Sequence, residues 1–178
     1  MGLRKASSYS KKKVRPYTRK SSKRAKSYIK AIPQNKIVKF NMGNTKAHVQ
    51  GKHKYTVSMI CQEKAQIRDN ALESSRLLIN KTLERLAPGN YYLIVKVFPH
   101  HILRENKTAA GAGADRLSSG MKHSFGVTIG RAAIVSAGKE IFFVSCLDEK
   151  TVRIARQALQ KVKSKVPFRS KIVLEKTE

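Results

Sequence analysis

The feature that most constrains the fold of this chain is the absence of any acidic residue before Glu63. Residues 1–36 hold thirteen Lys or Arg, together with scattered Ser, Tyr and Pro. Cations without nearby carboxylates repel one another, so this stretch has little reason to fold by itself. We predict a basic, extended N-terminal segment over residues 1–35 that orders against phosphate, followed by a single core domain over residues 36–178.

The partner of this basic chain is predicted to be nucleic acid. The sequence has 38 Lys and Arg against 11 Asp and Glu, for a formal net charge of +27. Such an excess destabilises a compact state unless a polyanion neutralises it. Tyr9, Tyr17 and Tyr28 lie among the N-terminal cations and can stack on bases, which favours RNA over a merely solvated tail. A membrane partner is disfavoured, because the chain has no apolar run of about 18 residues.

Hydrophobic periodicity predicts an α+β core of two layers. Helical spacing of apolar residues indicates one helix from Glu63 to Pro88 and a second from the capping residue Asp148 to Pro167. A short helix is predicted over residues 116–126. Strand patterns occur over residues 36–43, 54–61, 91–98, 131–135, 141–147 and 171–176. The tight turn at residues 136–140 predicts a hairpin. The resulting order is ββαβ, a connector, then ββαβ, with both helices on one sheet.

The segment "LRENKTAAGAGADR" (103–116) resembles a nucleotide-binding glycine loop only superficially. A P-loop needs a Gly-Lys pair followed by Ser or Thr, and a dinucleotide fingerprint needs a third glycine after a strand. Neither is present. Because cations flank its small residues, we interpret it as an extended loop that reaches into RNA; these cations are Arg104, Lys107 and Arg116.

Two other groups of residues could suggest chemistry, but neither indicates an enzyme. His100 and His101 are adjacent on an extended chain, so their side chains point to opposite sides, and no spaced ligand set predicts a metal site. They are predicted instead to pack or to bind a phosphate or a 2′-hydroxyl. The acids Asp69, Glu73 and Glu84 are interpreted as a solvated helix face or as partners of Arg68, Arg76 and Lys81.

The two cysteines are predicted to be buried structural thiols. Cys61 and Cys146 lie far apart in apolar strand patterns, without neighbouring ligand residues. No cofactor is predicted for the chain. Two rivals to a structural RNA-binding protein stay open: a basic enzyme that modifies RNA, which would need an acid/base pair or a cofactor loop, and a chromatin-like DNA-binding protein.

Five motifs occur in the order found in one family of proteins. They are "RPYTRK" (15–20), "IPQNKIVKFNMGN" (32–44), "QIRDNALESSR" (66–76), "FPHHILRENK" (98–107) and "GAGADRLSSGM" (111–121). The chain resembles the universal family of large-subunit ribosomal protein sixteen in its archaeal and eukaryotic form, ribosomal protein ten-e. The resemblance covers essentially the whole chain, and "PYTRK" and "HHILRENK" look archaeal.

The resemblance implies a hammerhead-type fold that binds large-subunit ribosomal RNA near the base of the central protuberance. It implies that the loop matching residues 103–114 reaches toward the peptidyl-transferase region and the tRNA cleft. The expected partners are this RNA, tRNA and neighbouring ribosomal proteins in the cytoplasm, without homo-oligomers. The tRNA-proximal candidates are Arg104, Glu105, Asn106, Lys107, Thr108, Gly111 and Gly113. The candidates for ribosomal RNA binding are Arg4, Lys5, Arg15, Tyr17, Arg19, Lys20, Arg24, Lys36, His100, His101, Arg116 and Lys122.

The sequence departs from the family at one place. Where relatives usually have Lys-Pro after the Phe-Gly pair, this chain has Val127 and Thr128. A phosphate contact and a turn constraint are therefore in question there. Lys122 keeps one nearby cation, and Arg131 is a candidate to supply another.

Overall fold

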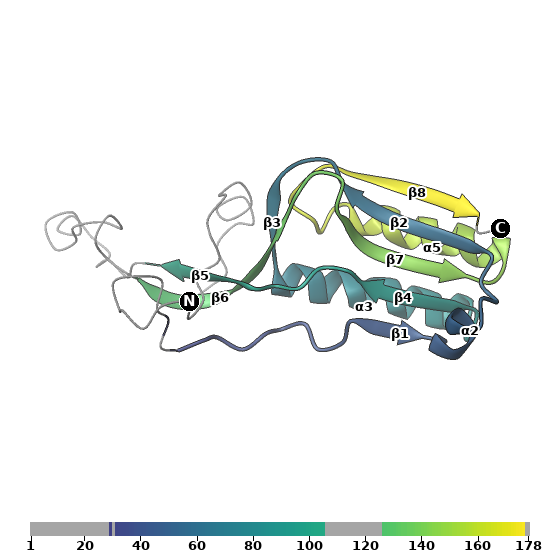
Figure 1. Cartoon of the computed structure of the whole chain (residues 1–178), viewed down its shortest axis with the longest axis horizontal. Coiled ribbons are helices and arrows are strands. Elements are labelled where there is room, and N and C mark those ends of the chain that lie inside the picture. Colours follow the sequence, from purple (N-terminus) through teal and green to yellow (C-terminus); the bar gives the residue numbers. More distant parts are fainter. Residues whose placement is uncertain (1–28, 30, 106–125, 177–178) are drawn as a thin grey trace, which may run out of the picture.

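The computed structural model describes residues 29, 31–105 and 126–176, and these form a mixed α/β structure with two antiparallel sheets (Figure 1). The larger sheet has the order β1-β4-β7-β2-β8, made by Asn41–Gly43, Tyr91–Val95, Glu140–Cys146, Tyr55–Cys61 and Ser170–Lys176. The smaller sheet has the order β3-β6-β5, made by Ala65–Arg68, Val127–Val135 and His101–Glu105. The α+β class is thus confirmed.

Two long helices cover one face of the larger sheet. α3 (Asp69–Leu86) and α5 (Glu149–Val162) lie side by side behind the strands (Figure 1). Their inner sides are apolar and join one buried core with the facing strand residues. Burial of these side chains is the main stabilising term for such a layer. Members of this core include Leu72, Ile79 and Leu83 from α3, Val152, Ala155 and Leu159 from α5, and Val57, Met59, Leu93 and Phe142 from the sheet.

The predicted hairpin between residues 131–135 and 141–147 is wrong. β6 pairs with β3 and β5, whereas β7 pairs with β2 and β4, so the turn between them joins two different sheets. The turn is held by β2: the Gly138 amide donates to the Cys61 carbonyl at 2.7 Å, and the Cys61 amide donates to the Lys139 carbonyl at 2.9 Å. Gly138 has φ +81, a left-handed conformation that glycine adopts without strain.

The first long helix begins later than predicted, because β3 occupies the start of the expected range. Ile67, which lies within the predicted helix, is a fully buried strand residue, and α3 begins at Asp69. The helix does end before Pro88, at Leu86. Leu86 itself is 45% exposed, so it does not belong to the side of α3 that packs in the core.

Two further short elements were missing from the predicted order. The strand predicted over residues 91–98 ends early, with β4 at Tyr91–Val95, and an unpredicted strand, β5, begins at His101. The turn between the first two strands contains α2 (Thr45–Val49), whose Asn44 cap accepts a hydrogen bond from the Ala47 amide at 3.0 Å. The strand predicted over residues 36–43 is regular only at β1, while the helix predicted over 116–126 lies almost wholly outside the described residues.

The predicted C-terminal helix and strand are both present, but the helix ends at Val162, five residues before the predicted end at Pro167, and the predicted cap is wrong. α5 follows Asp148, although the carboxylate accepts from Asn90 at 3.3 Å and caps no helix amide. β8 spans Ser170–Lys176, close to the predicted range. Both cysteines are buried and free, and burial raises the pKa of the Cys146 thiol to about 12. Their assignment as structural thiols is consistent with this burial.

Candidate nucleic-acid interface

The strands β5 (His101–Glu105) and β6 (Val127–Val135) bring together the two described stretches of chain on either side of residues 106–125. Their antiparallel register pairs His101 with Ala132 and Glu105 with Val127. In Figure 1 the two strands extend together away from the larger sheet, and we call this pair of strands the β5–β6 arm. The segment between them therefore leaves and re-enters the structure at one place, with Arg104 opposite Thr128.

The departure from the family motif has a defined structural position. Val127 and Thr128 are the first residues of β6, and they pair with Glu105 and Arg104. β-Branched residues favour this extended conformation, whereas proline would remove a backbone donor from the strand. The replacement of Lys-Pro by Val-Thr is thus compatible with strand pairing up to residue 127, beyond a shift in register between Leu103 and Arg104. Val127 is 48% exposed, so it contributes an apolar side chain to the surface of this arm.

The adjacent histidines differ in environment, as their alternation along the strand predicts. His100 is exposed, whereas His101 is 4% exposed. Burial lowers the pKa of His101, and the charges of Arg104 and His100 lower it further. The neutral imidazole is therefore favoured at His101. An RNA contact is more accessible to His100 than to His101.

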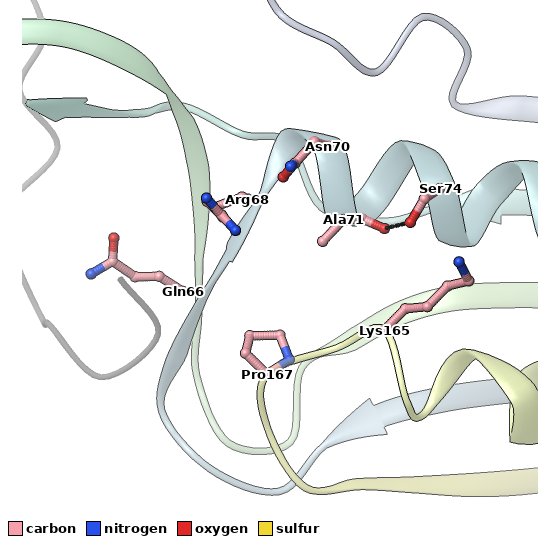
Figure 2. A pocket seen from close by; sticks show the side chains of 7 residues that line it. All are labelled: Gln66, Arg68, Asn70, Ala71, Ser74, Lys165 and Pro167. Atoms are coloured by element: carbon pink, nitrogen blue, oxygen red, sulfur yellow. Dashed lines mark hydrogen bonds between the residues drawn. The ribbon is translucent and has the colours of Figure 1, made fainter. Parts of the chain in front are cut away.

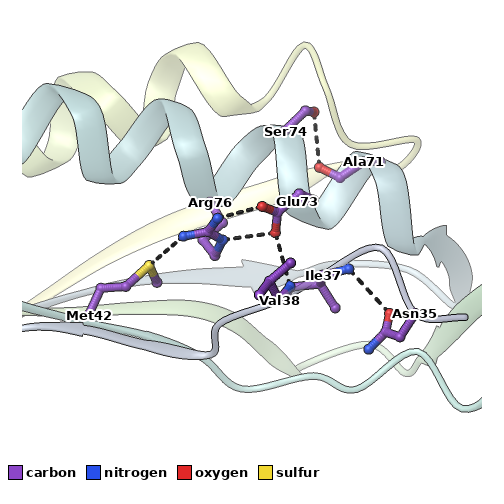
Figure 3. A network of polar contacts seen from close by, with 8 residues as sticks. All are labelled: Asn35, Ile37, Val38, Met42, Ala71, Glu73, Ser74 and Arg76. Atoms are coloured by element: carbon purple, nitrogen blue, oxygen red, sulfur yellow. Dashed lines mark hydrogen bonds and ion pairs between the residues drawn. The ribbon is translucent and has the colours of Figure 1, made fainter.

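A strap formed by residues 31–40 runs along α3 toward β1 (Figures 1 and 3). The Lys36 amide donates to Asp69 Oδ2 at 3.1 Å, and the Val38 amide donates to Glu73 Oε2 at 3.4 Å. Further along the chain, Met42 Sδ lies 3.0 Å from Arg76 Nη1. Acidic side chains of α3 thus hold the backbone of the strap, while the Lys36 side chain is exposed.

The acids of α3 are consequently not a simple solvated face. Glu73 forms the expected ion pair with Arg76, and this pairing lowers the pKa of the Glu73 carboxyl. Asp69, however, is 4% exposed. Glu84 accepts a hydrogen bond from the Tyr91 hydroxyl at 2.5 Å, rather than pairing with Lys81. These carboxylates hold neighbouring segments in place.

The strap begins beside the β5–β6 arm. Arg131, on β6, donates from Nε to the carbonyl oxygen of Pro33 at 2.7 Å. Ile29 is 2% exposed and therefore also belongs to the buried part of the molecule. The chain thus passes from the predicted basic segment into the core next to the strand pair that bounds residues 106–125. The described residues that adjoin the two predicted RNA-binding regions, Pro33 and Arg131, are thus in direct contact.

A pocket of about 290 Å³ lies where β3, the start of α3 and the chain after α5 meet (Figure 2). Most of the seven lining residues are polar. Two of them are cations: Arg68 comes from β3, and Lys165 comes from the chain after α5. Sequence reasoning missed this pocket, because its walls come from segments nearly 100 residues apart. The lining residues are Gln66, Arg68, Asn70, Ala71, Ser74, Lys165 and Pro167.

A histidine pair joins α2 to the larger sheet. His48 Nδ1 lies 3.1 Å from Ser145 Oγ, and His53 Nδ1 lies 2.9 Å from the same atom. The His48 ring also stacks on Tyr92, with centroids 4.6 Å apart. Burial, followed by the charge of His48, lowers the pKa of His53. The pair was not predicted, and it holds α2 against β7.

Five of the predicted site residues lie in the described part of the chain. They are Lys36, His100, His101, Arg104 and Glu105, and the other predicted site residues lie outside the described residues. Within the described part of the chain, no three His, Cys, Asp or Glu side chains gather as they would around a metal ion. None of its helices has the length and apolar character that a membrane span requires. The residues outside it are Arg4, Lys5, Arg15, Tyr17, Arg19, Lys20, Arg24, Asn106, Lys107, Thr108, Gly111, Gly113, Arg116 and Lys122.

Comparison with known proteins gives one consistent result. The family model described as ribosomal protein L16p/L10e matches residues 14–173. The large ribosomal subunit protein uL16 of Staphylothermus marinus is 43% identical over 176 residues, which cover 98% of this chain and 95% of the relative. The proteins of the same name from Thermofilum pendens and Methanococcus maripaludis are also 43% identical, over 92% and 99% of this chain and 91% and 96% of theirs. The similarity extends along nearly the whole of each chain.

Proposed function

The chain belongs to the L16p/L10e family of large-subunit ribosomal proteins, and from this premise we propose that it is a structural constituent that binds large-subunit ribosomal RNA and helps to form the tRNA cleft. In this proposal the N-terminal segment docks on the RNA. The segment at residues 103–116 contributes to the cleft near the peptidyl-transferase region. The side chains of the protein take no part in the chemical reaction.

One observation carries the proposal: the register that pairs Glu105 with Val127. This pairing brings Glu105, near the start of the glycine- and alanine-rich segment, next to Val127, just after the chain returns at Gly126, at one end of a two-stranded arm. Small residues let a backbone approach RNA closely, while cations at its base balance phosphate charge. The Arg131 to Pro33 hydrogen bond supports the proposal further, because Pro33 lies near the end of the basic N-terminal segment and is held beside the same arm.

The proposed mechanism is charge neutralisation combined with recognition of RNA shape. Each phosphate that a Lys or Arg neutralises releases condensed counterions, so the affinity must fall as salt rises. The formal charge of +27 allows many such contacts. Phosphate contacts fix position and orientation, whereas stacking by Tyr17 and hydrogen bonds to 2′-hydroxyl groups select RNA over DNA.

A competition experiment tests the proposal against its two rivals. The purified full chain is bound to protein-free large-subunit ribosomal RNA, and duplex DNA is added as the competitor. We expect the folded RNA to stay bound at a large mass excess of DNA, with affinity decreasing steeply in KCl. Equal competition by DNA would favour a general DNA-binding protein. Chemical turnover of the labelled RNA by the protein alone would favour an enzyme.

A further inference from the structure

The exposed side of α5 and the chain that follows it are rich in cations. From Lys150 to Leu174 the chain contains eight Lys or Arg and no acid. Burial follows the helical period, so the core side of α5 is apolar while the opposite side is polar and exposed. We call this opposite side the α5 basic side; it consists of Lys150, Arg153, Arg156, Gln157, Gln160 and Lys161.

The charges of the α5 basic side are not balanced within the described residues. None of its cations lies in an ion pair there; Arg76–Glu73 and Lys96–Glu140, by contrast, are paired. The neighbouring helix α3 provides a direct comparison. It has three acids and three Lys or Arg, so its net formal charge is zero. α5 has one acid, Glu149, and four Lys or Arg, so its net formal charge is +3. Two helices in the same layer therefore differ in charge.

Helix stability alone does not explain the cations of α5. A cation in the first turn of a helix is unfavourable to the macrodipole, whereas one in the last turn is favourable. Lys161 is in the last turn, but Lys150 is in the first. The macrodipole thus accounts for Glu149 in the first turn and Lys161 in the last, but not for Lys150, Arg153 or Arg156.

The chemistry of these side chains fits a polynucleotide backbone. Guanidinium groups bind phosphate through two parallel hydrogen bonds, and glutamine amides donate to phosphate or exchange hydrogen bonds with ribose hydroxyls. The 14 residues of α5 extend about 21 Å at 1.5 Å per residue, long enough to meet several successive phosphates. Beyond the helix, the exposed Lys165 continues the same charge and also lines the pocket opposite Arg68 (Figure 2).

We propose that the α5 basic side, continued by Lys165, is a second RNA-binding surface that recognises the phosphate backbone of folded RNA. The proposal rests on the function proposed above, since it assigns a further contact to the same class of partner. It differs in place, because it uses neither the N-terminal segment nor residues 103–116. Arg153 and Arg156 are the central contacts.

The test compares two matched double variants of the full chain. Arg153→Gln/Arg156→Gln removes two charges from α5, while Lys81→Gln/Arg85→Gln removes two from α3. All four positions are exposed, and glutamine has a helix propensity close to that of Lys and Arg, so both variants should keep the fold. Binding to protein-free large-subunit ribosomal RNA is measured by filter retention across a KCl series, and circular dichroism checks the fold.

We expect the magnitude of the slope of log K against log salt to fall by about 1.4 to 1.8 in the α5 variant, from about 0.7 to 0.9 for each lost contact. The α3 variant should keep the wild-type slope. Arg153→Lys/Arg156→Lys should restore it, because the charges return. Equal slopes for the two glutamine variants would overturn this inference alone. A wild-type protein that binds this RNA without salt dependence would instead contradict the function proposed above.

Discussion

Arg131 on β6 donates a hydrogen bond from Nε to the carbonyl oxygen of Pro33, at a distance of 2.7 Å across 98 residues of sequence. This contact ties the strap to the β5–β6 arm. We expect Arg131→Ala to lower the free energy of unfolding by about 1.5 to 3 kcal/mol, the range for hydrogen bonds to charged groups. Urea denaturation measures the change, and limited proteolysis should show faster cleavage near residues 31–36. Lys139→Ala, at an exposed turn, is the control; equal loss in both variants would contradict this role.

The ion pair of Glu73 with Arg76 should make stability depend on pH. Because the pKa of Glu73 is lowered in the folded state, its contribution is present above the ordinary value of 4.5 and is lost as pH falls through the folded value. Wild type should therefore exceed Glu73→Gln in unfolding free energy at pH 7, and the difference should shrink below pH 4.5. Urea titrations of both proteins over this range test it. A difference in unfolding free energy that does not change with pH would contradict this and show that the charge of Glu73 makes no contribution to stability.

Position 43 requires glycine for two reasons: the backbone is left-handed there, and a neighbouring carbonyl leaves no room for a side chain. Its φ is +90, and a Cβ atom at this position would lie 2.4 Å from the Tyr91 carbonyl oxygen. Gly138 has φ +81 but no atom within 4 Å of such a Cβ, which makes it the matched control. Gly138→Ala should cost about 1 to 2 kcal/mol from backbone strain alone. Gly43→Ala should cost more, as measured by urea midpoints. Equal costs would mean that β1 and β4 can separate without penalty.

Arg104 and Lys107 are expected to act on tRNA more than on folding. Subunits carrying Arg104→Gln/Lys107→Gln should assemble normally but bind tRNA more weakly, by roughly tenfold if each lost charged contact contributes about 0.7 kcal/mol. Retention of labelled tRNA on purified ribosomes measures the effect. Lys39→Gln/Lys46→Gln, at exposed positions on other segments, is the control. Normal tRNA retention and translation in the first variant would reject the assignment of the loop.

The N-terminal cations are expected to dock the protein on RNA. Replacing Arg15, Arg19 and Lys20 by glutamine should make the salt dependence of binding shallower by about 2 to 3 in log-log slope, at about 0.7 to 0.9 for each contact. The unfolding free energy of the purified protein should stay unchanged. Filter binding over a KCl series gives the slope. If the variant keeps the wild-type slope, these residues do not contact phosphate.

The elements that could be predicted from the sequence are those with a complete local pattern. α5 shows an uninterrupted helical period, and β2, β4 and β8 are rich in β-branched or aromatic residues. In these segments the local preference and the tertiary environment agree. Their positions therefore followed from the sequence to within a few residues.

The pairing of strands depends on distant partners that local patterns do not encode. The Ser136–Lys139 turn has the composition of a hairpin, yet it connects β6 and β7 in different sheets. β3 and β5 were missed because each is short and is completed by β6. In the candidate site, the charges were evident from the sequence. The hydrogen bond from the Lys36 amide to the Asp69 carboxylate could not be predicted, because 33 residues separate the two in the sequence.

The measurement that tests the central claim most directly is sedimentation of the tagged protein from cell lysate on a sucrose gradient, repeated after a moderate-salt wash. If the protein is an integral constituent, it should migrate with large ribosomal subunits at one copy per subunit and stay with them through the wash. Migration mainly near the top of the gradient, or substoichiometric association lost at low salt, would contradict the claim and indicate a transient factor or another RNA partner.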